Sequence, residues 1–316
     1  MTKSTVGNFI KKKAIYIVLI AIILFFTLTT DTFLTVNNLL NIVRQVSMLG
    51  IASVGMTFVI LLGGIDLSTG SIITFVNIFM AYMMVNMGIN MWIAGIIILL
   101  LSTLIGLLNG IEVSVFKIPA LIATFATQTI FAGIAYLISG GMPISGFPKG
   151  FAVIGQGYVG IIPVPVIIMI VVFAVGSFIL NKSYFGRYFY ALGGNEDAAK
   201  LSGIRVKRVK MLVYSLSGFF AGLAGIVMLS RTNSGQATSG KGFEFEVITA
   251  VVLGGVSVSG GSGKISNVIG GALIMGVLSN GMVLLDISSY MQMVIKGLIL
   301  VLAVGFDCWQ KNESGE

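Results

Sequence analysis

The chain has 316 residues, of which 56% are hydrophobic and 9% charged, and its mean hydropathy is +1.04. A soluble domain of this length could not bury so much apolar surface, so the composition indicates a membrane protein. The formal net charge of +8 comes from basic residues scattered between apolar runs, which argues against nucleic-acid binding. Because there is no histidine and one cysteine, Cys308, an intrachain disulfide, a Cys/His metal cluster and a histidine base are excluded.

Apolar segments long enough to cross a hydrocarbon layer about 30 Å thick recur along the whole chain. The first follows Lys11–Lys13, and because no small-residue cleavage site comes after it, we expect a retained helix and not a secretory signal. The eighth is short and begins with Glu244 and Glu246, which makes it the weakest candidate. The ten expected spans cover residues 14–30, 46–62, 68–87, 91–111, 118–138, 161–180, 211–230, 244–259, 265–285 and 290–306.

The basic residues orient these spans. With both termini in the cytoplasm, ten crossings place 14 of the 19 basic residues inside, four outside and Lys296 within the last span. This is the distribution that the positive-inside rule describes. We therefore expect an all-α, polytopic transmembrane bundle of the inner (cell) membrane, with residues 1–316 forming a single permease domain.

Glycine interrupts the chain in two similar stretches, 62–71 and 253–262, which agree at six of ten positions. Backbone groups freed by such breaks cannot face lipid, so they must be buried in protein or line a water-filled path. Paired interruptions point to the translocation pathway of a transporter built from parallel repeats, whereas tight helix–helix turns are the alternative. The pathway candidates are Gly63, Gly64, Asp66, Ser68, Gly254, Gly255 and Ser257, joined on composition alone by Phe125, Thr127 and Gln128.

The second stretch continues into Gly263 and Lys264, as a phosphate-binding loop would. However, Val258 and Ile265 stand where that loop needs glycine and a serine or threonine. We therefore expect no ATP and no other cofactor on this chain.

Residues 181–210 form the long polar stretch between spans and carry seven basic residues, so we expect a cytoplasmic loop. Asn195 is a good N-cap, acidic residues follow it, and Gly203 can end a helix, which predicts a short helix of about two turns. The loop is either a docking element or a connector whose charges only fix the topology.

The pattern Glu196-x-Ala198-Ala199-x-x-x-Gly203 resembles the coupling loop of ABC importer permeases, and residues 186–204 and both glycine stretches are similar to the ribose-type branch. The likeness covers about residues 44–307. It implies that a separate ATPase subunit, which holds ATP and Mg, docks on this loop. The contact would involve Gly194, Asn195, Glu196, Ala198, Ala199, Ser202 and Gly203. The resemblance also implies an extracytoplasmic sugar-binding protein and a second permease copy or homologue as partners.

Charged residues near the membrane are functional candidates because they are costly there. We expect Lys296 to snorkel or to pair with a residue such as Asp286. Residues expected near water at cytoplasmic helix ends are Asp66, Glu112, Lys264 and Asp307. Outside, the segments 139–160 and 230–241 offer surfaces to a binding protein. The rim candidates, which could equally anchor helix ends, are Arg231, Lys241, Glu244 and Glu246.

The function we expect is that of a permease subunit in an ATP-driven importer for a monosaccharide such as ribose, and not that of an enzyme. Nucleosides, amino acids or a signalling sugar are alternative cargoes. An ion-gradient carrier is a rival class, against which stands the lack of a series of Asp, Glu and His across the spans. A membrane enzyme has no nucleophile–base set or metal cluster in its favour, and no metal site is expected.

Overall fold

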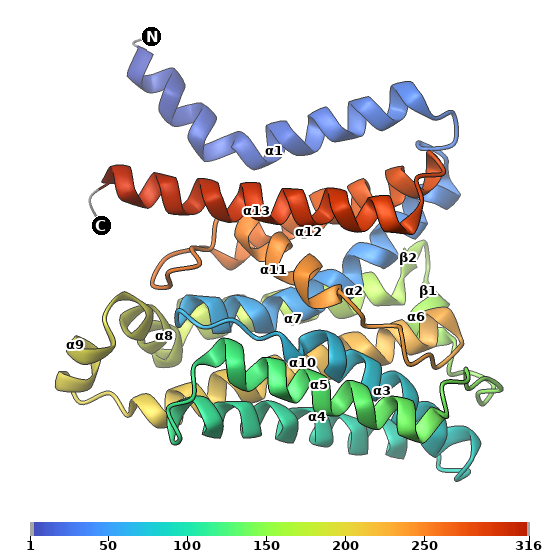
Figure 1. Ribbon diagram of the computed structural model, residues 1–316. Helices are drawn as coiled ribbons and strands as arrows, with labels where there is room; N and C mark the ends of the chain where they lie inside the picture. The colour runs from blue at the N-terminus through green and yellow to red at the C-terminus, as the bar shows by residue number, and fades with distance from the viewer. Residues whose placement is uncertain (1–2, 315–316) are drawn as a thin grey trace.

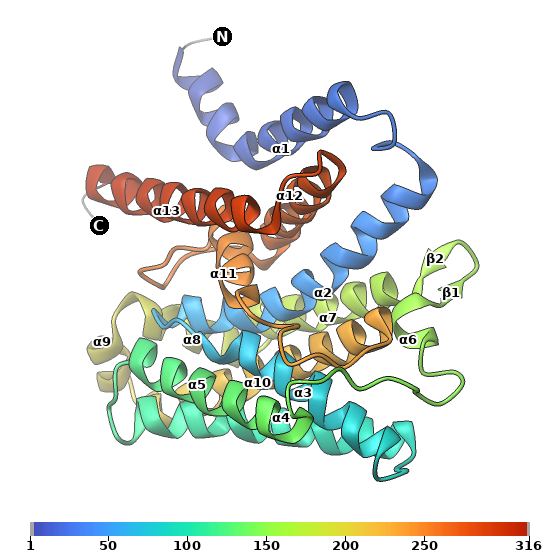
Figure 2. The ribbon, with the colours of Figure 1, turned by 45° about the vertical axis from the view of Figure 1, so that its right-hand side comes forward.

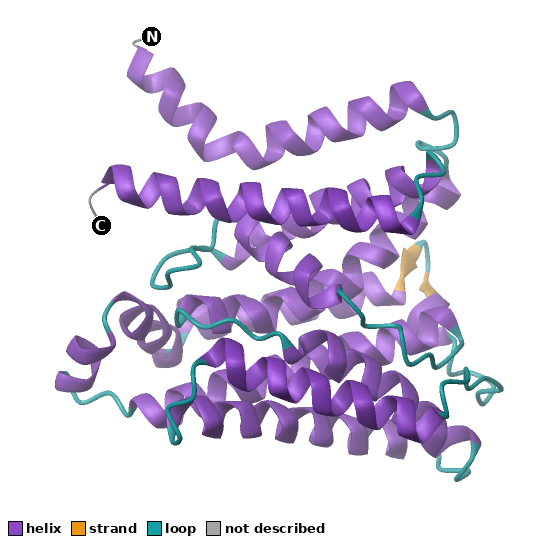
Figure 3. Ribbon diagram, viewed as in Figure 1, coloured by secondary structure: helices purple, strands orange, loops and turns teal. Residues whose placement is uncertain are grey.

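The computed structural model describes residues 3–314 and is almost wholly helical (Figures 1 and 3). Its helices are α1 (Lys3–Thr29), α2 (Val36–Leu61), α3 (Ser68–Val85), α4 (Met91–Ser114), α5 (Ala120–Ser139), α6 (Val153–Gln156), α7 (Val164–Lys182), α8 (Tyr184–Gly194), α9 (Glu196–Leu201), α10 (Val206–Thr232), α11 (Phe243–Leu253), α12 (Ile265–Leu284) and α13 (Ser289–Ser314). Two short strands, β1 (Tyr158–Val159) and β2 (Ile162–Pro163), pair antiparallel before α7. The predicted all-α bundle is confirmed.

Eight helices of the described residues are long and apolar enough to span a membrane, namely α2, α3, α4, α5, α7, α10, α12 and α13. The described apolar part of α1, Ile15–Thr29, adds a shorter segment. The predicted eighth span is helical only to Leu253, because Gly254 and Gly255 end α11, and residues 254–264 continue as a loop. These passages agree with the expected count of about ten.

The two ends of the described chain lie on the same side of the bundle as α8 and α9, as Figures 1 and 2 show. The β1–β2 hairpin and the loop between α10 and α11 lie on the opposite side. Because the basic segment 181–210 marks the inner face, the first side is cytoplasmic. The expected cytoplasmic location of both termini agrees with this arrangement.

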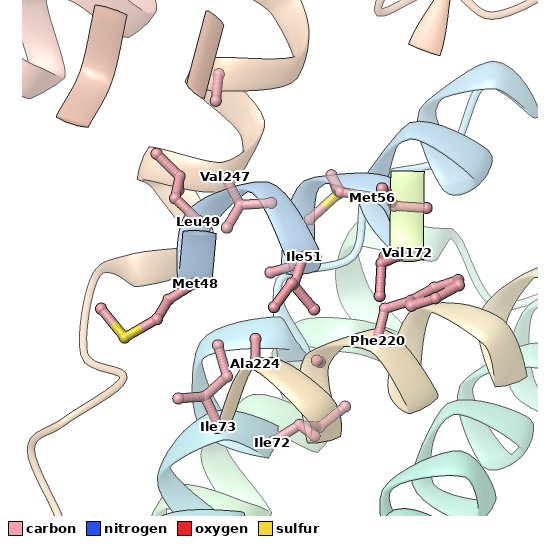
Figure 4. Close-up of a cluster of buried hydrophobic side chains, with 14 of the residues drawn as sticks. Met48, Leu49, Ile51, Met56, Ile72, Ile73, Val172, Phe220, Ala224 and Val247 are labelled. Atoms are coloured by element: carbon pink, nitrogen blue, oxygen red, sulfur yellow. The ribbon is translucent and has the colours of Figure 1, made fainter. Parts of the chain in front are cut away.

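The centre of the bundle is α2, which packs against α7, α10, α11 and α12. Figure 4 shows apolar side chains from α2, α3, α7, α10 and α11 meeting there, and Ile51 and Met56 have no exposed surface. The backbones of α4 and α10 approach closely, since a side chain on Gly218 would collide with the carbonyl of Ser102. Small residues at such crossings are typical of membrane helices.

Two helices lie at the edge of this core. The side chains of α13 that the structure describes, residues 289–309, are all at least partly exposed, among them Tyr290 and Leu302. One face of α5 is equally open and carries Phe125, which is 58% exposed, and Leu137. Apolar surfaces of this extent must be covered by lipid or by another protein chain.

Candidate translocation and coupling site

Asp66 lies in the break between α2 and α3 and is fully buried. Its Oδ1 accepts hydrogen bonds from the Ser68 backbone N at 3.0 Å and from Ser68 Oγ at 2.5 Å. Its Oδ2 accepts one from Ser217 Oγ of α10 at 2.7 Å. The expected position near water at a helix end is therefore wrong for Asp66. The Ser68 N–H group and hydroxyl, together with the Ser217 hydroxyl of α10, replace water around the carboxylate.

This network extends across four helices. Asn109 of α4 donates through Nδ2 to Ser68 Oγ at 2.8 Å, and Thr127 of α5 donates to Asn109 Oδ1 at 2.6 Å. The Leu67 backbone N donates to Thr124 Oγ1 at 3.1 Å. The polar groups of Asp66, Leu67 and Ser68 described above therefore all have hydrogen-bond partners inside the protein. These bonds fix the first glycine stretch to α4, α5 and α10.

Glu244 and Gln128 form a second polar contact, where α11 meets α5. Gln128 Nε2 donates to Glu244 Oε1 at 2.7 Å, and Glu244 is only 2% exposed. The other carboxylate oxygen, Oε2, lies against Gly70 and has no hydrogen-bond partner among the described residues. Glu244 therefore does not lie at a rim, because the turn at Gly242, with φ of +79°, brings the chain back into the bundle.

Three glycine-containing segments meet at the cytoplasmic end of the bundle. The Gly261 backbone N donates to the carbonyl of Leu61 at 2.9 Å. A Cβ on Gly193, at the end of α8, would collide with both of these groups, and a Cβ on Gly260 would lie 2.8 Å from Gly63 N. We call Leu61, Gly63, Gly193, Gly260 and Gly261 the glycine junction. It joins both interrupted stretches to the base of the coupling loop.

The second glycine stretch is also tied to α13. Ser257 Oγ and the Val258 backbone N both donate to Asp307 Oδ2, each at 3.0 Å. Tyr190 of α8 donates through its hydroxyl to the carbonyl of Gly263 at 2.9 Å, and partial burial raises the pKa of this tyrosine. The loop after α11 is thus held from two sides.

The predicted coupling helix is α9, with six residues. Asn195 caps it, since its Oδ1 accepts from Ala198 N at 2.9 Å, and Gly203 ends it at φ of +83°. Glu196 pairs with Lys210 at 2.6 Å. The cap and the stop are as predicted from the sequence.

The two faces of α9 differ. Ala199 is 4% exposed and packs against its own bundle, so it is not on the outer face of the helix. Leu201 is 90% exposed although it is a large apolar residue on the cytoplasmic side. Sequence reasoning did not select Leu201, and the signal that could have found it is an apolar residue among charged neighbours at the end of a short helix.

On the outer side, Lys296 pairs with Glu246 at 2.7 Å and not with Asp286. Both side chains are half-buried between α11 and α13. Among the other rim candidates, Arg231 is half-buried and Lys241 is exposed. Their contact with a binding protein stays a prediction.

A cavity of about 560 Å³ opens on the cytoplasmic side next to α9. Its walls are the end of α4, the turn before α5, α9 and the first turns of α10, and it extends to Gly63 and Gly64. Its lining residues are Leu62, Gly63, Gly64, Val113, Ser114, Lys117, Ile118, Pro119, Ala120, Glu196, Lys200, Val206, Lys207, Lys210 and Tyr214. We call it the lysine cavity.

The structure is a multi-pass helical bundle with interrupted passages and a capped cytoplasmic helix, and the comparisons with known proteins identify it as an inner-membrane permease. The chain belongs to the family described as the permease component of branched-chain amino acid transport systems, whose model matches residues 38–304. The resemblance to ABC importer permeases of the ribose type is likewise confirmed by the relatives.

The ribose import permease protein RbsC of Haemophilus influenzae is 45% identical over 303 residues, covering 95% of this chain and 94% of that protein. RbsC of Bacillus subtilis is 42% identical, covering 92% of this chain and 90% of its own length. The L-arabinose transport system permease protein AraH of Escherichia coli is 38% identical, with coverages of 89% and 85%. No solved structure matches this chain.

Proposed function

We propose that this chain is the transmembrane subunit of an ATP-binding cassette importer that moves ribose into the cytoplasm. The match between this chain and its sugar-permease relatives covers nearly the full length of both proteins. Two of these relatives are ribose import permeases at 42% to 45% identity. The observation that carries the mechanism is the glycine junction, where the base of the coupling loop contacts both interrupted stretches. Energy enters from a separate ATPase chain that binds ATP and Mg.

The ATPase docks on α9. Leu201 supplies an apolar anchor on the exposed face, and the small side chain of Ala198 leaves room for close contact. Displacement of α9 passes through α8 to Gly193. Because backbones touch there without intervening side chains, the two stretches must follow this movement with little slack.

The sugar passes along the open face of α5, opposite a second copy of the permease. Phe125 offers an aromatic surface on this face, and the half-buried Gln128 offers an amide. Sugar hydroxyls and sugar rings are recognised by such groups. A soluble sugar-binding protein delivers the cargo from the outside, near Arg231 and Lys241.

The test is uptake of labelled ribose by vesicles that contain the permease, its ATPase and its binding protein. Leu201→Asp should lower both uptake and copurification of the ATPase at least about tenfold, since a charge replaces the apolar anchor. Leu201→Met keeps an apolar side chain of similar size and should behave as the wild type. Uptake that continues without ATP or without the ATPase would refute the proposal.

Competition in the same vesicles addresses the cargo. An excess of unlabelled ribose should abolish uptake of the label, whereas L-arabinose should compete weakly and leucine should not compete. Strong competition by leucine with weak competition by ribose would shift the assignment to amino acids.

A further inference from the structure

We propose that the lysine cavity is a binding site for a phosphate group, carried by a small phosphorylated sugar or polyol on the cytoplasmic side. The cavity contains four lysines and one glutamate. The glutamate, Glu196, is paired with Lys210. Among the described side chains, no ion pair involves Lys117, Lys200 or Lys207. Three like charges in one concave site repel one another and favour an anion.

The wall of the cavity holds a buried hydroxyl group without a hydrogen-bond partner, which is a second, independent observation. Ser114 lines it and is only 7% exposed, yet its Oγ has no hydrogen-bond partner among the described residues. Buried hydroxyls are nearly always partnered, and an orphan of this kind calls for an explanation. Because this oxygen is enclosed, a phosphate oxygen or a sugar hydroxyl would become its partner once the Ser114 side chain turned toward the cavity.

The backbone holds one lysine in a strained position at the cavity wall. Lys117 adopts φ of +58°, a conformation uncommon for residues other than glycine, asparagine and aspartate. The flanking amides are fixed, since Phe116 N bonds to Ile111 O at 3.3 Å and Ile118 N to Glu112 O at 3.1 Å. Strain that the surrounding structure maintains is characteristic of ligand sites.

Size and chemistry narrow the ligand class. A volume of about 560 Å³ is in the range of small-molecule sites and is larger than inorganic phosphate requires. A phosphate monoester brings up to two negative charges and several acceptor oxygens for the lysines. A polyhydroxylated body could then extend toward Tyr214, which is buried and lines the same cavity. A lipid headgroup offers the same phosphate chemistry from another source.

Occupancy would act on the coupling helix, a consequence that rests on the proposed function. Glu196 of α9 holds Lys210 of α10, so an anion that binds Lys210 competes with this ion pair. The position of α9 would then depend on how much phosphorylated product has accumulated inside the cell. The phosphorylated sugar, formed from the imported sugar in a later step, would in this way inhibit further import.

The binding test uses the full chain in nanodiscs of zwitterionic lipid and needs no transport. Calorimetric titration should detect ribose 5-phosphate and show no binding of unphosphorylated ribose at this site. The double variant Lys117→Gln/Lys207→Gln should weaken the ester by about 100-fold, at about tenfold for each lysine. The control Lys182→Gln/Lys264→Gln removes the same charge from the cytoplasmic side outside the cavity and should leave binding within about threefold.

A second arm distinguishes a lipid source. If a lipid headgroup occupies the cavity, phosphatidylglycerol should copurify with the wild type and the control but not with the cavity variant, and added phosphatidylglycerol should displace the ester. If neither the ester nor the anionic lipid separates the cavity variant from its control, the proposal is wrong. Ester binding in a chain that fails to import sugar would leave the site standing and refute only the transport assignment.

Discussion

The two glycine stretches use the same chemistry with its parts exchanged. In the first, Asp66 provides the carboxylate and Ser217 of α10 provides a hydroxyl. In the second, Ser257 stands at the position corresponding to Asp66 and provides the hydroxyl, while Asp307 of α13 provides the carboxylate. In each, a backbone N–H of the stretch also bonds to the carboxylate. In each helix break, one buried or half-buried carboxylate therefore accepts hydrogen bonds from a backbone N–H group and a serine hydroxyl.

The surroundings of the two acids differ. Asp66 is fully buried among α3, α4 and α10, whereas Asp307 lies on α13, the helix that is least enclosed by the bundle. The first stretch is anchored to the core, and the second is anchored to an edge helix. The contrast predicts that the first stretch deforms less than the second when the coupling loop moves the glycine junction.

The largest effect is expected for Asp66→Ala. It leaves Ser217 Oγ and the Ser68 N–H without their buried acceptor, which should cost about 3 kcal/mol or more of folding free energy. Asp66→Asn keeps an acceptor and the side-chain shape and should lose less. Thermal melting followed by size-exclusion chromatography measures this. Equal melting of Asp66→Ala and the wild type would show that the network does not fix the first stretch.

A large but smaller effect is expected at the point that links the stretches. Gly193→Ala places a methyl group against the Leu61 carbonyl and Gly261 N, and the overlap should cost about 1–3 kcal/mol. Gly305→Ala of α13 is the control, because a Cβ there has no neighbour within 4 Å and the residue lies outside the expected ATPase contact. Stimulation of the ATPase by cargo should fall with the first and persist with the second. Identical behaviour of the two variants would remove the junction from the coupling route.

The ion pair between Glu246 of α11 and Lys296 of α13 tests how firmly the second stretch is held. Lys296→Met leaves Glu246 half-buried without its partner and should destabilise the protein by about 1–2 kcal/mol. The double variant Lys296→Met/Glu246→Gln removes both charges and should recover part of this loss. A double-mutant cycle from melting data measures the coupling, and purely additive losses would contradict a functional pair.

The smallest effect is expected for Asp307→Asn. It weakens two hydrogen bonds from Ser257 and Val258 at a half-buried site, so the expected loss is about 1 kcal/mol. Hydrogen exchange should increase in residues 254–264 and stay unchanged in residues 62–71. Increased exchange in both regions would show that the stretches do not respond independently.

Hydropathy, the positive-inside rule and capping signals predicted the helical bundle, its orientation and α9, because each depends on neighbours in the sequence. Proximity of Leu61, Gly193 and Gly261 could not be predicted in this way, since it depends on how distant helices pack. For the same reason the sequence placed Asp66 near water and Glu244 at a rim. Their burial is created by partners on other helices, such as Ser217 and Gln128.

The glycine junction also bears on how the chain is assembled. Gly261 follows Leu61 by 200 residues, and Gly193 lies between them. The three segments can meet only after most of the polypeptide has left the ribosome and entered the bilayer. In chains truncated before residue 260, the cytoplasmic end of the bundle should therefore lack the glycine junction. Quality-control proteases could recognise this unpacked end during synthesis.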